Sequence, residues 1–142
     1  MHEVQIKLPS NPKLCKIVRS GVSHLCEIIG FSEDDTNAVV RAVDEALSNI
    51  IRHTYAGNTN KSIVVISRVH QDRLEVALRD FGDRIDPNKI KPRDLTDVRP
   101  GGLGVHLIRS SMDEVHYNQE LDVGNELILS KYLPGKKVTD GS

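Results

Sequence analysis

The most informative stretch of this 142-residue sequence reads Val43-Asp44-Glu45-Ala46-Leu47-Ser48-Asn49-Ile50-Ile51-Arg52-His53. Its apolar residues recur at a spacing that favours a helix buried on much of its circumference. Glu45, Asn49 and His53 follow one another at intervals of four, which turns an α-helix by about 400° and advances it by about 6 Å per step. The three polar side chains therefore form one row. This row can face a single ligand in a cleft, or it can lie on a solvated side of the helix.

Three segments before this row have clear periodicities. Residues 3 to 8 alternate apolar and polar side chains and predict a half-buried first strand. Residues 11 to 29 carry apolar side chains at helical spacing and predict a helix. Ser32, followed by acidic residues, is typical of a helix start and predicts a second helix over residues 34 to 55.

The segments after the row read mainly as strands. Residues 61 to 70 and 73 to 79 are rich in Val, Ile and Leu and predict an antiparallel hairpin. Residues 82 to 100 predict a long loop, which is uncommon in a small domain unless it is functional. The rest of the chain predicts a helix that ends at about Met112, then strands at 114 to 119 and 124 to 133.

This order of elements predicts an α+β fold, a two-layer sandwich in which about three helices cover one face of a mixed, mostly antiparallel sheet. A chain of this length is sufficient for one domain with one core. We expect the domain to span residues 1–133 and residues 134–142 to form a flexible tail.

Composition and charge argue against several classes of function. The 19 Lys and Arg nearly balance the 20 Asp and Glu, and with 4% aromatic residues the chain lacks the basic profile of a nucleic-acid-binding protein. The longest apolar run, residues 63 to 66, is far shorter than the roughly 18 residues of a membrane span. The start of the sequence also lacks the pattern of a secretory signal. We therefore expect a cytoplasmic protein that binds neither nucleic acid nor membranes.

Two further motifs have the chemistry of nucleotide binding. Asp80 ends a predicted strand and can accept a hydrogen bond from the exocyclic amine of adenine, where guanine offers an oxo group. Gly82 lets the backbone approach a flat base closely. An ordinary strand-ending turn is the other interpretation of this motif.

The glycine cluster Gly101-Gly102-Leu103-Gly104 precedes a helix predicted to begin at about Val105, and Arg99 stands beside it. Backbone N–H groups at such a helix start can bind phosphate oxygens. The spacing matches neither the P-loop nor the dinucleotide fingerprint, so a flexible turn is equally compatible with it.

Together, and in this order, the polar row, the Asp-x-Gly turn and the glycine cluster resemble the nucleotide site of the Bergerat-fold (GHKL, histidine-kinase-like) ATPases. Within that superfamily the sequence is most similar to the anti-sigma-factor serine/threonine kinases of bacterial partner-switching systems. The similarity runs from about Val4 to Leu133 and is densest at residues 43 to 53 and 99 to 108.

The resemblance implies ATP and Mg²⁺ as cofactors and a role for each motif residue. It implies Glu45 as the base for the attacking hydroxyl, Asn49 as the Mg²⁺ ligand and Asp80 as the residue that reads adenine. The other ATP-binding residues that it implies are Arg52, His53, Gly82, Arg99, Gly101, Gly102, Leu103, Gly104 and Val105.

The resemblance also implies partners. The expected activity is transfer of the ATP γ-phosphate to a STAS-type anti-anti-sigma protein, together with binding of a sigma factor or an equivalent regulator by a homodimer. The alternative is a nucleotide-dependent protein-binding switch without kinase turnover. The ATP-binding half of a sensor histidine kinase is not favoured, because 142 residues leave no room for a phospho-accepting helical hairpin.

One stretch departs from the pattern of this family. After Gly82 the family usually continues with a small residue or Pro and then Phe-Asp-Pro, whereas this chain reads Asp83-Arg84-Ile85-Asp86-Pro87. The departure bears on nucleotide affinity and on the movement of the following loop.

Overall fold

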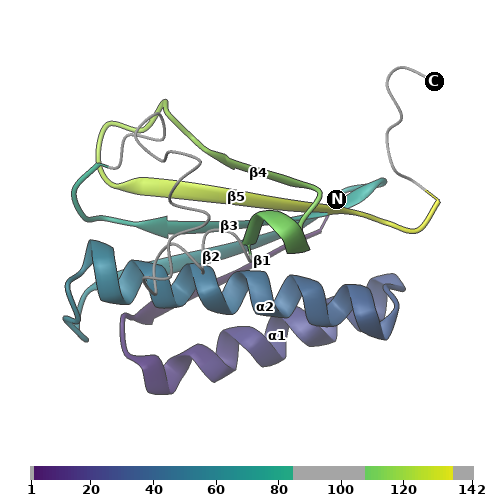
Figure 1. Ribbon diagram of the computed structural model, residues 1–142, viewed down its shortest axis with the longest axis horizontal. Coiled ribbons are helices and arrows are strands. Elements are labelled where there is room, and N and C mark those ends of the chain that lie inside the picture. Colours follow the sequence, from purple (N-terminus) through teal and green to yellow (C-terminus); the bar gives the residue numbers. More distant parts are fainter. Residues whose placement is uncertain (1, 85–107, 136–142) are drawn as a thin grey trace.

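A computed structural model describes residues 2–84 and 108–135, which form two layers (Figure 1). One layer is a five-stranded sheet, and the other contains the long helices α1 (Cys15–Ile29) and α2 (Glu33–Asn49). The strands are β1 (His2–Pro9), β2 (Ser62–Val69), β3 (Arg73–Asp80), β4 (Glu114–Tyr117) and β5 (Asn125–Tyr132). The shorter helical segments are the 3-10 turn η1 (Pro12–Leu14), the segment η2 (Ile50–Thr54) and residues 108–111.

The strand order in the sheet is β1-β2-β3-β5-β4, and each pairing among the described residues is antiparallel. The predicted α+β sandwich is therefore confirmed, although its sheet is antiparallel over the described residues rather than mixed. β5, the last strand in sequence, lies between β3 and β4. This arrangement places Asn125 directly opposite Asp80, where β3 ends and β5 begins.

The predicted helix starts and stops are present as side-chain and backbone caps. The Asn11 side chain accepts a hydrogen bond from the Lys13 N–H at 3.0 Å, with Pro12 in the first turn. Gly30 ends α1 in the left-handed conformation at φ 95°. Ser32 Oγ accepts from the Asp35 N–H at 3.1 Å and caps α2, whose first turn is acidic.

The hydrophobic core lies between the helix layer and the sheet. Fully buried aliphatic side chains come from both helices and from the central strands, and each is expected to stabilise the fold by about 1.5–3 kcal/mol. The largest of them are Leu47, Ile63, Leu74, Leu78, Leu129, Val18, Val22, Val39, Val43, Val65 and Val76.

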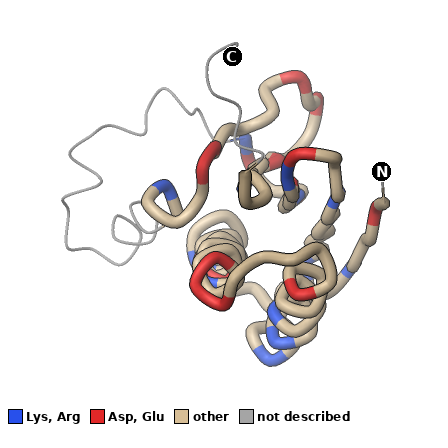
Figure 2. The backbone as a smooth tube through the Cα atoms, turned by 90° about the vertical axis from the view of Figure 1, so that its right-hand side faces the viewer, with Lys and Arg blue, Asp and Glu red and all other residues tan. Residues whose placement is uncertain are grey.

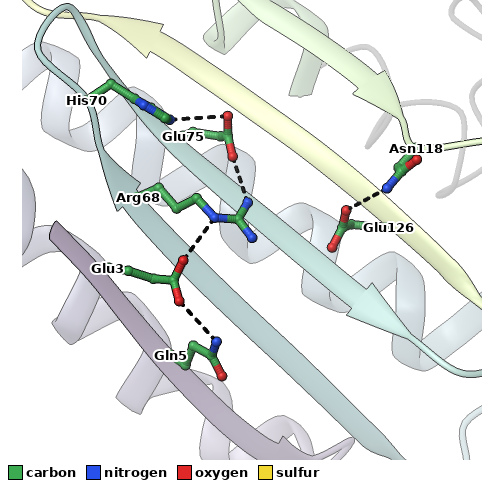
Figure 3. A network of polar contacts seen from close by, with 7 residues as sticks. All are labelled: Glu3, Gln5, Arg68, His70, Glu75, Asn118 and Glu126. Atoms are coloured by element: carbon green, nitrogen blue, oxygen red, sulfur yellow. Dashed lines mark hydrogen bonds and ion pairs between the residues drawn. The ribbon is translucent and has the colours of Figure 1, made fainter. Parts of the chain in front are cut away.

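The opposite face of the sheet carries a network of charged side chains (Figure 3). Arg68 on β2 donates to Glu3 on β1 at 3.1 Å and to Glu75 on β3 at 2.7 Å. Glu75 also lies 3.4 Å from His70 Nε2. Basic and acidic segments occur in the helix layer and in the sheet layer, so neither layer carries charge of a single sign (Figure 2).

The second helix differs from its prediction in one respect. The sequence predicts one helix over residues 34 to 55, but regular α-helix ends at Asn49, and η2 continues it as a π-helix. The Tyr55 N–H donates to the Ile50 carbonyl at 2.9 Å, five residues back rather than four. The Tyr55 hydroxyl donates to the Ser62 carbonyl at 2.6 Å and accepts from the Phe81 N–H at 2.7 Å. These tertiary contacts hold the wider turn, a type that is frequent at functional sites.

Several sequence predictions lie outside the described residues. They are the loop beyond Arg84, the glycine cluster at 101–104 with Arg99 and Val105, and the tail beyond residue 135. Within the described ranges, the structure contains no helix that is both long enough and apolar enough to cross a membrane.

Candidate functional site

A cavity of about 220 Å³ opens between the C-terminal end of α2 and strands β3, β4 and β5. Its walls are largely apolar, as is usual for small-molecule sites. The apolar lining residues are Ala46, Ile50, Leu78, Ile108, Val115 and Leu127. Polar side chains from several different elements also reach the lining and can orient a ligand; they belong to Asn49, His53, Thr54, Asp80, Arg109, Tyr117 and Asn125.

The structure brings three of the predicted site residues to this one cavity. Asn49 is the last residue of α2, His53 lies in η2, and Asp80 is the last residue of β3. Asn49 and His53 reach the same cavity across the α-to-π transition. Residues from a helix and from a strand 31 positions later therefore share one site.

Glu45 and Arg52 adjoin the cavity without lining it. Arg52 Nη2 lies 3.7 Å from Glu45 Oε2 and donates to Asn49 Oδ1 at 3.4 Å. Glu45 Oε2 is shielded from solvent and has no hydrogen-bond partner among the described residues. A shielded carboxylate oxygen without a donor has an unmet requirement that a ligand or a hydroxyl can satisfy.

Asp80 is the buried carboxylate of the site, at 2% exposure. Its Oδ1 accepts from Asn125 Nδ2 at 2.9 Å and from the Gly82 N–H at 3.0 Å. Burial raises the pKa of Asp80, and these hydrogen bonds act in the opposite direction. Gly82 lies close against Thr54: a Cβ at position 82 would overlap the Thr54 side-chain methyl, so that side chain would have to move.

Ten lining residues are absent from the predicted site: the six apolar residues named above and four polar ones, Thr54, Arg109, Tyr117 and Asn125. Burial and the charge of Asp80 raise the pKa of Tyr117, while Arg109 opposes the shift. Two of these residues had a signal in the sequence. Tyr117 lies two residues after Val115, and Asn125 lies two residues before Leu127. Residues two apart in a strand share a face, so Tyr117 and Asn125 face inward with these apolar neighbours.

The predicted phosphate-binding residues Arg99, Gly101, Gly102, Leu103, Gly104 and Val105 lie outside the described residues. The next described residues, Ile108 and Arg109, line the cavity.

The donor set of the site suits a metal–nucleotide complex better than a free metal ion. Within residues 2–84 and 108–135, no group of three or more His, Cys, Asp and Glu side chains is arranged to hold a metal. Asn49 lines the cavity, and its amide oxygen, which accepts a hydrogen bond from Arg52, is an oxygen ligand of the kind that Mg²⁺ takes. Mg²⁺ is suited to such an arrangement, since it takes one or two protein oxygens and completes its shell with water and phosphate.

Comparisons with known proteins agree with this geometry. Residues 8–131 match the family described as Histidine kinase-like ATPase domain. The chain is 33% identical to the serine-protein kinase RsbW of Bacillus licheniformis, over 98% of this chain and 91% of the relative. It is 30% identical to the serine-protein kinase RsbW of Listeria monocytogenes, over 100% of this chain and 95% of the relative.

Two solved structures share the fold. A Mycobacterium tuberculosis structure with RsbU and RsbW domains superposes with a TM-score of 0.67 at 19% identity, over 99% of this chain and 35% of that chain. The histidine kinase domain of a blue-light activated histidine kinase from Erythrobacter litoralis superposes with a TM-score of 0.57 at 16% identity, over 90% of this chain and 63% of that chain.

Proposed function

The chain belongs to the histidine kinase-like ATPase domain family, and on this premise we propose that it is an ATP-dependent protein serine/threonine kinase of a partner-switching system. Relatives that it matches over nearly their whole length are serine-protein kinases. In this proposal it acts in the cytoplasm through a domain at residues 1–133. It transfers the ATP γ-phosphate to a STAS-type anti-anti-sigma protein and binds a sigma factor or an equivalent regulator.

The observation that carries the proposal is the convergence of Asn49 and Asp80 on one apolar cavity. The apolar walls suit the faces of a purine, and the Asp80 carboxylate can accept a hydrogen bond from the exocyclic amine of adenine. Asn49 would hold Mg²⁺, which neutralises phosphate charge when it is bound. His53 lines the same cavity, and Arg52 contacts Asn49 from outside it.

Glu45 is the proposed general base. Its Oε2 has no hydrogen-bond donor in the described part of the chain, and Glu45 lies on the same helix as Asn49, one turn earlier. It would accept the proton of the attacking Ser or Thr hydroxyl as that oxygen bonds to the γ-phosphorus and the bond to the β-phosphate oxygen breaks. Arg99, Gly101, Gly102, Leu103, Gly104 and Val105 are the proposed phosphate-binding residues.

The role of Glu45 is tested by Glu45→Gln, which keeps the size of the side chain and removes the base. We expect Mg·ATP binding to persist and phosphate transfer to a STAS-type partner to fall by about 100-fold or more. Glu27→Gln, on the exposed surface of α1, is the matched control. Transfer by the Glu45 variant at the rate of the control would refute the base role.

A nucleotide-dependent switch without turnover is the second candidate. The observation that favours it is the position of Glu45, which pairs with Arg52 rather than lining the cavity. Both functions predict that Mg·ATP raises the melting temperature by mass action. Radiolabel transfer from γ-labelled ATP to the partner separates them, because only the kinase produces a phosphorylated Ser or Thr.

A homodimer is part of the proposal. Large apolar side chains are exposed on two elements, Val4 on β1 and Ile17 and Ile28 on α1, at 48%, 57% and 67% exposure. Such side chains are available for burial against a second copy. Sedimentation equilibrium tests this part, with twice the 15.8 kDa chain mass as the expected result.

A further inference from the structure

The turn between β4 and β5, residues 118–124, packs against the end of β3 where Asp80 lies. Gly124 adopts φ 74° and passes so close that a Cβ on it would overlap the Asp80 carbonyl oxygen. The next residue, Asn125, is 5% exposed and pairs directly opposite Asp80 in the sheet. The side chains of such a pair lie within contact distance of one another.

Asn125 connects two parts of the nucleotide site through one amide nitrogen. Its Nδ2 donates to Asp80 Oδ1 at 2.9 Å and to the Asp83 carbonyl at 2.8 Å. The Gly82 N–H donates to the same Asp80 Oδ1 at 3.0 Å. Two donors therefore hold one oxygen of the carboxylate, which fixes the direction in which Oδ2 points.

Arg84 holds the turn in place from the other side. Its guanidinium donates to the carbonyl oxygens of Gln119, at 3.2 Å, and of Leu121. Arg84 and Asp83 belong to the stretch where this sequence departs from its family. In this chain, the departing residues thus tie the end of β3 to the turn that carries Asn125.

We infer that Asn125 is the positioning residue that sets the purine preference of this site, by holding Asp80 so that its second carboxylate oxygen meets the exocyclic amine of adenine. The inference rests on the proposed function. Asn125 acts through Asp80: when its side-chain donor is removed, only backbone N–H groups among the described residues still hold the carboxylate, so the carboxylate is oriented less firmly. The site then distinguishes less well between a 6-amino and a 6-oxo purine.

Asp80 titration provides a readout that a purely structural role would not change. Burial raises the Asp80 pKa; the hydrogen bond from the Asn125 side chain opposes this rise most, and backbone hydrogen bonds from Gly82 and Asn125 oppose it as well. Among residues 2–84 and 108–135, titratable or charged groups around Asp80 include His53 from η2, Tyr55 after it, Tyr117 from β4 and Arg109. They are the same in each variant below, so differences between pH profiles report on the 80–125 pair.

The decisive variant is Asn125→Asp, which replaces the donor by a second carboxylate beside Asp80. Two carboxylates in contact repel one another, so the pair takes up one proton at a higher pH than a single carboxylate would. We expect ATP affinity at neutral pH to fall by about tenfold or more and to rise again as the pH is lowered and that proton binds. The unmodified chain should show the opposite trend, with binding lost as Asp80 is protonated.

The matched control is Asn118→Asp, which adds the same charge to the same turn. Asn118 Nδ2 donates to Glu126 Oε1 at 3.1 Å, outside the cavity lining (Figure 3). This control should keep the pH trend of the unmodified chain. Asn125→Leu, of similar size and without a donor, is the second variant and should reduce the ratio of ATP to ITP affinity by about tenfold.

The experiment measures dissociation constants of Mg·ATP and Mg·ITP by calorimetry between pH 5 and pH 8. An inverted pH trend in Asn125→Asp alone, or a reduced ATP to ITP ratio in Asn125→Leu alone, supports the inference. Equal behaviour of the position-118 and position-125 variants overturns it while leaving the kinase proposal intact. An unmodified chain that binds no ATP overturns the proposed function and this inference together.

Discussion

Replacing Asp80 by Asn should convert the site from one that prefers a 6-amino purine to one that prefers a 6-oxo purine. Asp80 Oδ1 accepts hydrogen bonds from Asn125 and Gly82, so in the variant the amide oxygen must occupy that position. The amide NH₂ group then occupies the place of Oδ2. This NH₂ group and the adenine amine are both hydrogen-bond donors, so no hydrogen bond can form between them.

The magnitude follows from the lost hydrogen bond to a charged group. Such a bond contributes about 1.5–3 kcal/mol, so ATP affinity should fall by about 10-fold to 150-fold. Mg·ITP presents an oxo acceptor to the new NH₂ group, and its affinity should hold or increase. A selective exchange of this kind follows from the fixed orientation of the carboxyl group.

Calorimetric titration with Mg·ATP and Mg·ITP tests this prediction on the unmodified chain and on Asp80→Asn. Asp83→Asn is the matched control, because it removes a neighbouring carboxylate that does not line the cavity. Equal losses of both nucleotides in Asp80→Asn would contradict the assigned orientation. Unchanged ATP affinity would refute the role of Asp80 as the adenine acceptor.

Three further predictions concern stability and space. Burial raises the Asp80 pKa above its ordinary 3.8, so the ionised carboxylate lowers the free energy of unfolding of the ligand-free chain. This loss of stability is complete above the raised pKa and absent below 3.8. Urea unfolding across that pH range should show it in the unmodified chain and not in Asp80→Asn. Gly124→Ala should lower the free energy of unfolding by about 2–4 kcal/mol, because the added Cβ is strained at positive φ and overlaps Asp80. Gly57→Ala is the control: it has the same backbone strain at φ 82° but open space, and should lower the free energy of unfolding by only about 1 kcal/mol in the same urea assay. Ala46→Leu should fill part of the cavity and weaken Mg·ATP binding by about tenfold or more. The free energy of unfolding should change by less than about 1.5 kcal/mol. Full ATP affinity in this variant would mean that the nucleotide binds elsewhere.

Local patterns in the sequence predict much of the fold because their causes are local. The alternation at residues 3 to 8 and the Ser32 cap correspond to β1 and to the start of α2. The hairpin of β2 and β3 follows from two apolar runs joined by a polar pair. The placement of β5 between β3 and β4 depends on long-range packing, so no local pattern contains it.

Three residues of the cavity lining are found in local sequence motifs for the same reason. Asn49, His53 and Asp80 belong to recognisable local motifs, and the structure brings them to one cavity. Asn125 follows Gly124, and its spacing of two residues from Leu127 indicates an inward-facing position. Its long-range pairing opposite Asp80, which no local pattern contains, gives it a place in the cavity. The π-turn at η2 depends on contacts of Tyr55 with β2 and Phe81, which periodicity cannot reveal.

A crystal structure of the chain with Mg²⁺ and a non-hydrolysable ATP analogue tests the central claim most directly. We predict that the adenine amine lies within hydrogen-bond distance of Asp80 Oδ2 and that Asn49 Oδ1 binds Mg²⁺ at about 2.1 Å. A base bound outside the cavity, or an Asn49 side chain directed away from the metal, would contradict the account.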